Sequence, residues 1–121
     1  MILVADDEEV AREVARESFE SHGFRVMLAV NGKEAVDKFR DHAEEISAVL
    51  LDLTMPIMSG EEAFREIQSI RSNVPIVLSS GYTEQDAVKR FGGRGLTGFV
   101  QKPYAIMELT KKFHSLLHEV S

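Results

Sequence analysis

Four short apolar runs, each followed by polar side chains, are the first features of the sequence that indicate chemistry. The runs cover residues 2–5, 48–51, 74–78 and 98–100. The groups that follow them are three carboxylates, a hydroxyl and an ammonium, carried by Asp6, Asp7, Asp52, Ser79 and Lys102. Ligands of open α/β sheets bind at the edge where the strands have their carboxyl ends. We therefore expect these five side chains to meet at one edge of a sheet.

These side-chain types favour phosphoryl transfer assisted by a metal ion. Carboxylates without a neighbouring imidazole or thiol suit a hard cation that prefers oxygen, and Mg²⁺ fits best. The ammonium of Lys102 provides a point charge for a phosphate oxygen. A carboxylate is also a legitimate nucleophile toward phosphorus and forms an aspartyl phosphate. The set therefore predicts transfer of a phosphoryl group to one aspartate, with its charge shared among Mg²⁺, Lys102 and Ser79.

The rest of the chain alternates between strand-like and helical patterns. A β-rich stretch covers residues 24–30, and helical periodicity covers residues 8–22, 32–43, 61–70, 83–90 and 104–120. In the first helix the apolar stripe includes Val10, Val14 and Phe19. This alternation predicts one domain over residues 1–121, built as an α/β fold. Its five parallel strands form an open, doubly wound sheet with helices on both faces.

Composition narrows the classes of function. The chain has 121 residues, 20 acidic and 14 basic, for a net charge of −6. An acidic domain is repelled by phosphate backbones, which argues against direct binding to nucleic acid. Cysteine is absent from the sequence, which excludes disulfides and thiolate chemistry. The sequence lacks a secretory signal and an apolar run long enough for a membrane helix, so we expect a soluble, cytoplasmic domain without membrane contact.

Four stretches together resemble the receiver domain of two-component signalling, over essentially the whole chain. They are residues 2–8, 50–60, 75–81 and 99–103. Each motif alone is weak, but four in the right order at the right strand ends are specific. The resemblance implies the flavodoxin-like (βα)5 receiver fold, with strand order 2-1-3-4-5.

The resemblance also assigns the residues of the acidic site. Asp52 is then the phosphoacceptor. The Mg²⁺ ligands are Asp6, Asp7, Asp52 and the backbone carbonyl of Thr54. The lifetime of the aspartyl phosphate depends in this family on the positions held here by Thr54 and Gly81. Neither residue carries an amide or carboxylate that orients water, which implies slow loss of the phosphoryl group.

Further positions match the residues that sense the phosphoryl group in this family. Ser79 is the switch hydroxyl, Phe99 holds the aromatic switch position, and Lys102 contacts the phosphoryl group. The peptide bond before Pro103 is expected to be cis. Two residues depart from the commonest pattern, since serine replaces threonine at Ser79 and phenylalanine replaces tyrosine at Phe99. The first change keeps the hydroxyl, whereas the second removes a hydroxyl on which switching sometimes relies.

The resemblance implies a partner that donates the phosphoryl group and a surface that reports it. The donor is the phosphohistidine of a histidine kinase or of a histidine phosphotransfer domain. The usual partner surface comprises the fourth helix, fifth strand and fifth helix, which here carry Gln85, Lys89, Arg90, Arg94, Lys111 and Lys112. This surface is locally basic despite the acidic total. A weak homodimer remains an open alternative to a monomer.

The sequence leaves the setting of the domain open. Residues 78–82 and 99–104 resemble receivers attached to hybrid histidine kinases, which we favour over a stand-alone response regulator. A full-length kinase of that kind could tether the domain to a membrane. The domain itself is expected to be a switch and not an enzyme. The alternative is a Mg²⁺-dependent phosphatase with Asp52 as nucleophile, although 121 residues leave no room for a cap domain. A flavodoxin-like carrier of FMN fits less well, because residues 6–8 are acidic where a phosphate loop would lie.

Overall fold

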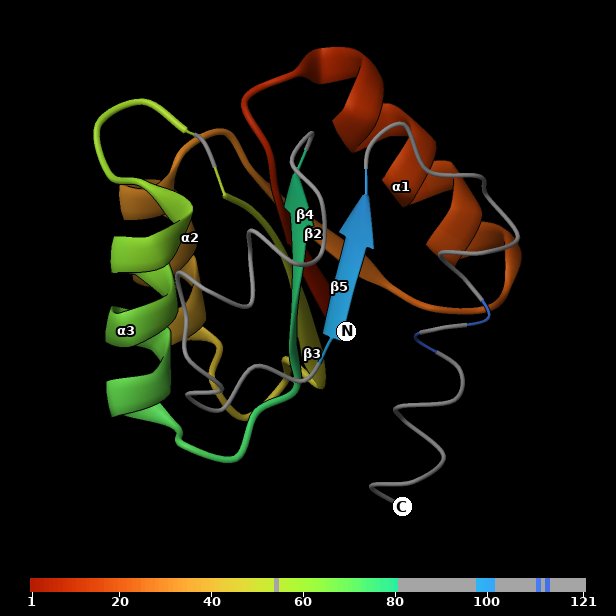
Figure 1. Cartoon of the computed structure of the whole chain (residues 1–121). Helices are drawn as coiled ribbons and strands as arrows, with labels where there is room; N and C mark the ends of the chain where they lie inside the picture. Colours follow the sequence, from red (N-terminus) through yellow and green to blue (C-terminus); the bar gives the residue numbers. More distant parts are fainter. Residues whose placement is uncertain (54, 81–97, 102–110, 112, 114–121) are drawn as a thin grey trace.

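The computed structural model describes residues 1–53, 55–80, 98–101, 111 and 113, and shows a five-stranded parallel sheet (Figure 1). The strands are β1 (Ile2–Ala5), β2 (Val26–Ala29), β3 (Ala48–Asp52), β4 (Ile76–Ser80) and β5 (Gly98–Gln101). Their spatial order is β2-β1-β3-β4-β5. The described helices are α1 (Glu9–Ser21), α2 (Gly32–Asp41) and α3 (Gly60–Ile70). The parallel sheet and its strand order confirm the expected receiver fold.

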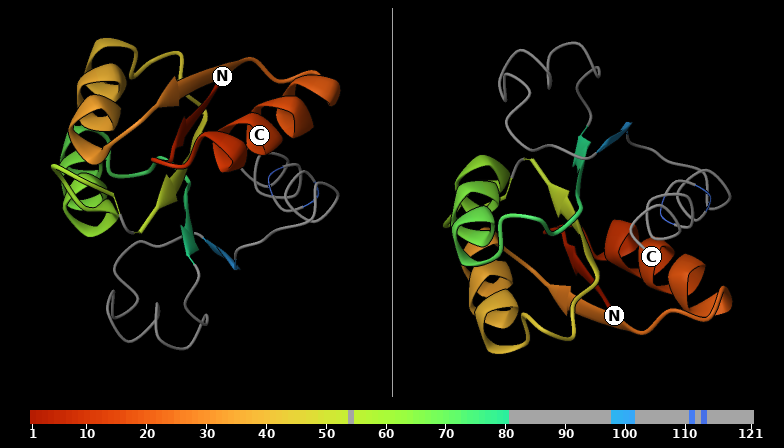
Figure 2. Two further views of the ribbon diagram at one scale, coloured as in Figure 1. Left: turned by 90° about the horizontal axis from the view of Figure 1, so that it is seen from above. Right: turned by 90° about the horizontal axis from the view of Figure 1, so that it is seen from below.

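Helices cover both faces of the sheet (Figure 2). α1 lies on one face, and α2 and α3 lie side by side on the other. Alternate strand residues divide between the two cores, as the period of a strand requires. The core under α1 includes Ile2, Val4, Leu50, Phe19 and Phe113. The core under α2 and α3 includes Leu3, Leu51, Leu78, Phe39 and Phe64. The central strands are therefore apolar on both faces, which explains their continuous hydrophobic runs.

Local signals define where the helices begin and end. The Asn31 side chain caps α2 by accepting a hydrogen bond from the backbone N–H of Glu34 at 2.8 Å. Ser59 caps α3 in the same way, through the N–H of Glu62 at 3.3 Å. Such side chains satisfy N–H groups that lack a partner within the helix. After α1 the chain turns at Gly23, whose φ of 88° suits glycine.

Some boundaries differ from those expected from the sequence. β2 is shorter than the predicted stretch 24–30, and β4 begins and ends two residues later than predicted, so that Ser79 lies within the strand. Val10 is 77% exposed and therefore lies outside the buried face of α1. The predicted helix at residues 83–90 lies outside the described residues. Of the predicted helix at 104–120, only Lys111 and Phe113 are described, and both are helical.

Phe113 connects this part of the chain to α1. Its ring is buried and contacts the ring of Phe19 edge-on, with 4.7 Å between the ring centroids. None of the helices in the described part of the chain is long and apolar enough to cross a lipid bilayer.

Candidate metal centre at the carboxyl edge of the sheet

Four carboxylates converge at the carboxyl edge of the sheet. Asp6, Asp7, Glu8 and Asp52 each offer one oxygen, and these four oxygens lie within 4.8 Å of one another. Asp6 and Asp52 are buried, with exposed fractions of 1% and 4%, whereas Asp7 and Glu8 are exposed. The cluster therefore has a buried base and an open rim.

The pairing of the strands explains this convergence. β1 and β3 are parallel neighbours, with Ala5 opposite Leu51, so that the residues that follow lie at the same edge. In β4, Ser79 lies opposite Asp52, and its backbone carbonyl accepts a hydrogen bond from the N–H of Leu53 at 2.9 Å. The structure thus brings together four of the residues expected at this edge, namely Asp6, Asp7, Asp52 and Ser79.

The turn between β1 and α1 is held by several hydrogen bonds. The N–H of Asp6 donates to the carbonyl of Ala29 at 3.1 Å. The Asp6 Oδ1 atom accepts from the N–H of Glu8 at 2.9 Å. The Asp6 carbonyl accepts from the guanidinium of Arg12 at 2.8 Å. These contacts fix the orientation of the buried Asp6 carboxylate and carry Glu8 into the cluster.

Sequence reasoning missed two residues of this region. Glu8 is part of the cluster, and its position directly after the two aspartates could have indicated this. Arg12 had no signal in the sequence. Its contact with Asp6 depends on how α1 leaves the turn, which the spacing of residues does not show.

The loop after β3 lies close to the first turns of two helices. The N–H of Gly60 donates to the carbonyl of Leu53 at 2.9 Å, and a Cβ at Gly60 would lie 2.1 Å from the carbonyl oxygen of Asp52. On the other side, the N–H of Gly32 donates to the carbonyl of Met58 at 3.2 Å. Only glycine permits both approaches, because any side chain would collide with backbone atoms.

The donor set of the cluster suits Mg²⁺. All four groups are carboxylates, and hard divalent cations prefer oxygen ligands. Two carboxylates are buried and close together, so their mutual repulsion favours a cation between them. The residues present therefore fit the ion that the sequence predicts.

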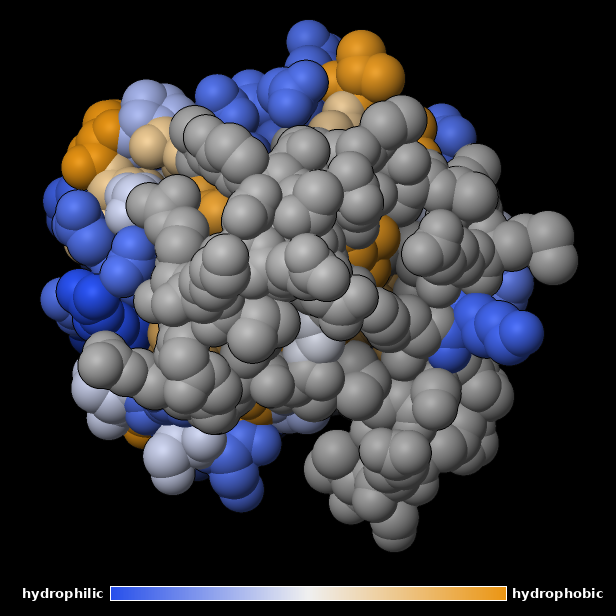
Figure 3. Space-filling view, viewed as in Figure 1, coloured by the Kyte–Doolittle hydropathy of each residue, from blue (hydrophilic) through white to orange (hydrophobic). Residues whose placement is uncertain are grey.

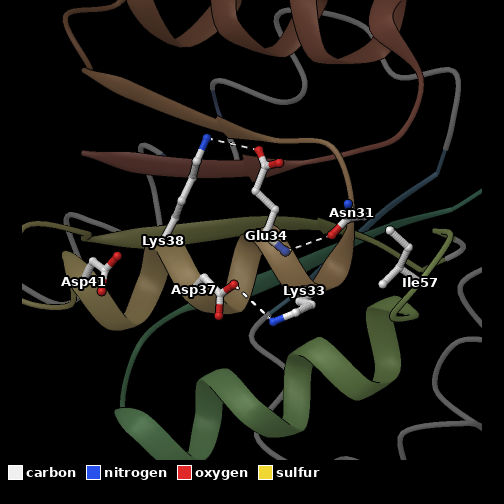
Figure 4. A pocket seen from close by; sticks show the side chains of 7 residues that line it. All are labelled: Asn31, Lys33, Glu34, Asp37, Lys38, Asp41 and Ile57. Atoms are coloured by element: carbon white, nitrogen blue, oxygen red, sulfur yellow. Dashed lines mark hydrogen bonds and ion pairs between the residues drawn. The ribbon is translucent and has the colours of Figure 1, made fainter.

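A hollow beside α2 is lined by residues that are not part of the acidic cluster (Figure 4). It has a volume of about 500 Å³ and is lined by Asn31, Lys33, Glu34, Asp37, Lys38, Asp41 and Ile57. Ion pairs join Lys33 to Asp37 at 3.4 Å and Lys38 to Glu34 at 3.1 Å. Both lysines that line the hollow pair with carboxylates of α2, which weakens their attraction for an anionic ligand.

The described surface is mainly hydrophilic in the view of Figure 3, with hydrophobic residues in a few separate places. The large hydrophobic side chains exposed in the described part of the chain are Val10, Val30 and Ile57. Ile57 lies in the loop after β3 and has a φ of 69°, which is unusual for a β-branched residue. Of the residues of the basic surface expected from the sequence, the structure describes only Lys111.

Several predicted site residues lie outside the described residues: Thr54, Gly81, Lys102 and Pro103. Phe99 is placed by its backbone alone, in β5 and opposite Leu78 of β4. Five residues of the expected basic surface, Gln85, Lys89, Arg90, Arg94 and Lys112, also lie outside the described part.

Curated relatives of this chain are response regulators. Response regulator MprA of Mycobacterium sp. (strain KMS) is 35% identical over 123 residues, which covers 99% of this chain and 51% of the relative. Response regulator RR06 of Streptococcus pneumoniae is 32% identical over 116 residues, covering 96% of this chain and 52% of the relative. The chain therefore spans about half the length of the curated relatives it matches.

Solved structures share the fold. The CheX–CheY–BeF3–Mg²⁺ complex from Borrelia burgdorferi contains a chain with a TM-score of 0.89 and 28% identity, covering 95% of this chain and 87% of that one. The receiver domain of the hybrid histidine kinase CckA matches with a TM-score of 0.81 and 26% identity, covering 96% of this chain and 97% of that one. A family model described as the response regulator receiver domain matches residues 2–114. The chain belongs to the family of response regulator receiver domains, the signalling switches of two-component systems.

Proposed function

We propose that this receiver domain accepts a phosphoryl group on Asp52 and uses it to switch a partner-binding surface. The observation that carries the proposal is the position of Asp52. Its carboxylate is buried at the end of β3, within 4.8 Å of three other carboxylate oxygens and in register with Ser79. Receiver domains of response regulators are phosphorylated by histidine kinases, so the donor is a phosphohistidine of a kinase or of a histidine phosphotransfer domain.

The proposed reaction is an in-line transfer to the carboxylate. An oxygen of Asp52 forms a bond to phosphorus while the bond between phosphorus and the imidazole nitrogen breaks. The electron pair of the broken bond returns to the nitrogen, and the donor is left as neutral histidine. Burial holds the Asp52 carboxylate in one orientation, which favours a reactive approach.

The proposed metal ligands are the carboxylates of Asp6, Asp7 and Asp52 and the backbone carbonyl of Thr54. When bound, Mg²⁺ supplies positive charge that offsets the carboxylates and the phosphoryl oxygens. The carboxylate-only donor set supports this assignment. The assignment is also supported by the Borrelia burgdorferi complex, which contains a similar chain and whose name includes BeF3 and Mg²⁺.

The remaining residues have proposed roles after the transfer. The hydroxyl of Ser79 and the ammonium of Lys102 stabilise the phosphoryl oxygens, with Pro103 following in a cis peptide bond. Movement of Ser79 toward the phosphoryl group allows Phe99 to change rotamer, which alters the partner surface. The register of Ser79 with Asp52 supports the first step. Thr54 and Gly81 would set the lifetime, since neither side chain orients water well.

The setting of the domain in a longer chain is part of the proposal. We favour attachment to a hybrid histidine kinase, and the similarity to the CckA receiver supports this choice. The relatives named as response regulators support the other setting, a stand-alone response regulator that is not attached to a kinase. The sequence of the full-length chain distinguishes the two.

Phosphorylation by a small donor tests the function. The protein is incubated with acetyl phosphate and Mg²⁺, and its intact mass is followed by mass spectrometry. We expect one added phosphoryl group on the wild-type protein and on Asp41→Asn, which removes an exposed carboxylate of α2. Asp52→Asn should gain none. Labelling that survives in Asp52→Asn would place the acceptor elsewhere. Repeated turnover of a generic phosphate ester would favour the alternative, a Mg²⁺-dependent phosphatase.

A further inference from the structure

We infer that Arg12 is a positioning residue of the metal site, because it holds the turn that carries three of the four carboxylates of the acidic cluster. The turn runs from Asp6 to Glu8, between the end of β1 and the start of α1. The inference rests on the proposed function in one respect, namely that the cluster binds Mg²⁺. It concerns a residue of α1 that contributes no carboxylate to the cluster.

The Arg12 side chain holds one end of the turn, and the backbone of α1 holds the other. The Arg12 guanidinium donates to the carbonyl of Asp6 at 2.8 Å. The carbonyl of Glu8 accepts the first backbone hydrogen bond of α1, from the N–H of residue 12 at 3.0 Å, and this bond does not depend on the arginine side chain. The two acceptors are separated by Asp7 alone, so the guanidinium supplies the contact on the side of that residue that the helix does not hold. The backbone that carries the Asp7 side chain is therefore held in place, although the side chain itself is exposed.

Fixing the turn matters because the four clustered carboxylates repel one another without a cation. Like charges at such short separations repel each other, and a free turn would relax by moving its exposed carboxylates outward. Ordering them again at the moment of metal binding would cost conformational entropy. A turn that is already held avoids this cost, as supporting contacts around metal ligands generally do.

The contact of Arg12 with Asp6 is of a strong kind. The donor is charged, the acceptor is a backbone carbonyl of a buried residue, and the Arg12 side chain is itself half-buried. Hydrogen bonds with a charged partner are stronger than neutral ones, and burial protects them from competition by water.

Arg16 provides a matched control one helical turn further along α1. Its guanidinium forms ion pairs with Glu13 and, at 2.8 Å, with Glu20, both on the surface of the same helix. Replacing Arg16 removes the same charge and the same side chain from the same helix, but leaves the hydrogen bond to Asp6 in place.

The experiment measures binding of Mg²⁺ to the folded protein by calorimetric titration, without a phosphoryl donor. The variants are Arg12→Met, Arg12→Lys and Arg16→Met. We expect Arg12→Met to raise the Kd for Mg²⁺ about three- to tenfold, because only part of the free energy of the lost hydrogen bond is linked to metal binding. Arg12→Lys retains a charged donor and should lie between Arg12→Met and the wild type. Arg16→Met should stay within about twofold of the wild type, since exposed ion pairs contribute little.

A second measurement separates positioning from general damage. The rate of phosphorylation by acetyl phosphate is measured as a function of Mg²⁺ concentration. For Arg12→Met, the concentration giving half the maximal rate should rise by the same factor as the Kd. The rate at saturating Mg²⁺ should remain within about twofold of the wild type, because the turn is then held by the ion.

Three outcomes would overturn the inference. One is Arg12→Met binding Mg²⁺ as tightly as the wild type, or more tightly, which would make its charge and not its hydrogen bond the dominant effect. Another is a fall in unfolding temperature without a change in Kd, which would make Arg12 purely structural. The third is a wild-type protein that binds no Mg²⁺. A wild type that binds Mg²⁺ but accepts no phosphoryl group would contradict the proposed function alone, since the binding titration still tests Arg12.

Discussion

Ile57 combines an exposed side chain with a strained backbone. Its φ of 69° lies in the left-handed region, where a branched Cβ crowds the backbone, and its side chain is 78% exposed. The strain is therefore not offset by burial of the side chain. It arises in the loop that follows Asp52, where the chain must turn sharply to reach α3.

We expect Ile57→Asn to stabilise the protein by about 1 kcal/mol, because asparagine tolerates this conformation far better. Urea unfolding measures the difference. Ile57→Val keeps the branched Cβ and should unfold as the wild type does. Equal stability of all three proteins would show that the loop is not strained at Ile57.

Gly60 leads to the opposite prediction for the same loop. A Cβ at Gly60 would lie 2.1 Å from the Asp52 carbonyl oxygen and 2.6 Å from the Leu53 Cα atom. Both are backbone atoms, so a side chain must displace the end of β3. Gly60→Ala should destabilise the fold by about 1–3 kcal/mol, the usual range for overpacking, and should also slow phosphorylation.

Gly23→Ala is the control for Gly60→Ala. It meets no atom within 4 Å, but its φ of 88° remains unfavourable for alanine. It should therefore lower stability by about 1 kcal/mol and leave the rate of phosphorylation unchanged. Unaltered phosphorylation of Gly60→Ala would contradict a link between this glycine and the position of Asp52.

The residues of the site could be predicted only where a general rule of the fold applies. Asp6, Asp7, Asp52 and Ser79 follow apolar runs, and parallel strands align their carboxyl ends. The contact of Arg12 with Asp6 could not be predicted in this way, because it depends on the direction in which α1 leaves the turn. The positive φ of Ile57 could not be predicted either, because isoleucine ordinarily favours negative φ.

At the scale of elements, the edge of the sheet at β2 is protected by a lysine. β2 is the terminal strand of the order. The carbonyls of Ala29 and of Arg25, the residue before the strand, accept hydrogen bonds from the N–H groups of Asp6 and Ile2 on the side of β1. The carbonyl of Leu28 points the other way, because successive residues of a strand alternate in direction. It accepts a hydrogen bond from the ammonium of Lys38 in α2 at 2.5 Å. A charged group at an edge strand hinders pairing with another chain.

We expect Lys38→Met to increase self-association through β2, because it frees a backbone acceptor at an edge and removes a charge. Sedimentation velocity over a range of protein concentrations measures it. Lys33→Met is the matched control, since Lys33 pairs with Asp37 on the exposed side of α2. Equal behaviour of both variants would show that Lys38 does not protect the edge.

The order and type of the elements could be predicted from the sequence more fully than their ends. The apolar runs located β1 and β3 because both strands are buried on both faces. The sequence places β4 two residues too early, because its serines resemble a turn. In the structure Ser79 pairs with Asp52 inside the sheet. Val10 was expected on the apolar stripe of α1, but periodicity does not show that the first turn of a helix can extend beyond the core.

For the molecule as a whole, stability should depend on Mg²⁺. The four clustered carboxylates repel one another in the folded state, and a cation that binds only this state stabilises it. The unfolding temperature should rise with Mg²⁺, with a gain of about 2.7 kcal/mol at a concentration about 100 times the Kd.

Scanning calorimetry with and without millimolar Mg²⁺ measures this gain. Asp7→Asn should blunt the response, because it removes one exposed carboxylate of the cluster. Asp41→Asn removes an exposed carboxylate outside the cluster and should respond as the wild type does. Identical melting curves of the wild type with and without Mg²⁺ would contradict a metal site at this edge.

Two glycines hold the loop after β3 closely against the first turns of α2 and α3. At one end Gly60 touches the carbonyl of Asp52, and at the other Gly32 is bonded to Met58. α2 and α3, which pack side by side, therefore meet the loop by direct contact between backbone atoms. Contact between backbone atoms passes on a displacement more completely than contact through flexible side chains. A shift at the end of β3 should therefore reach the first turns of both helices, and the face that they share should move with it.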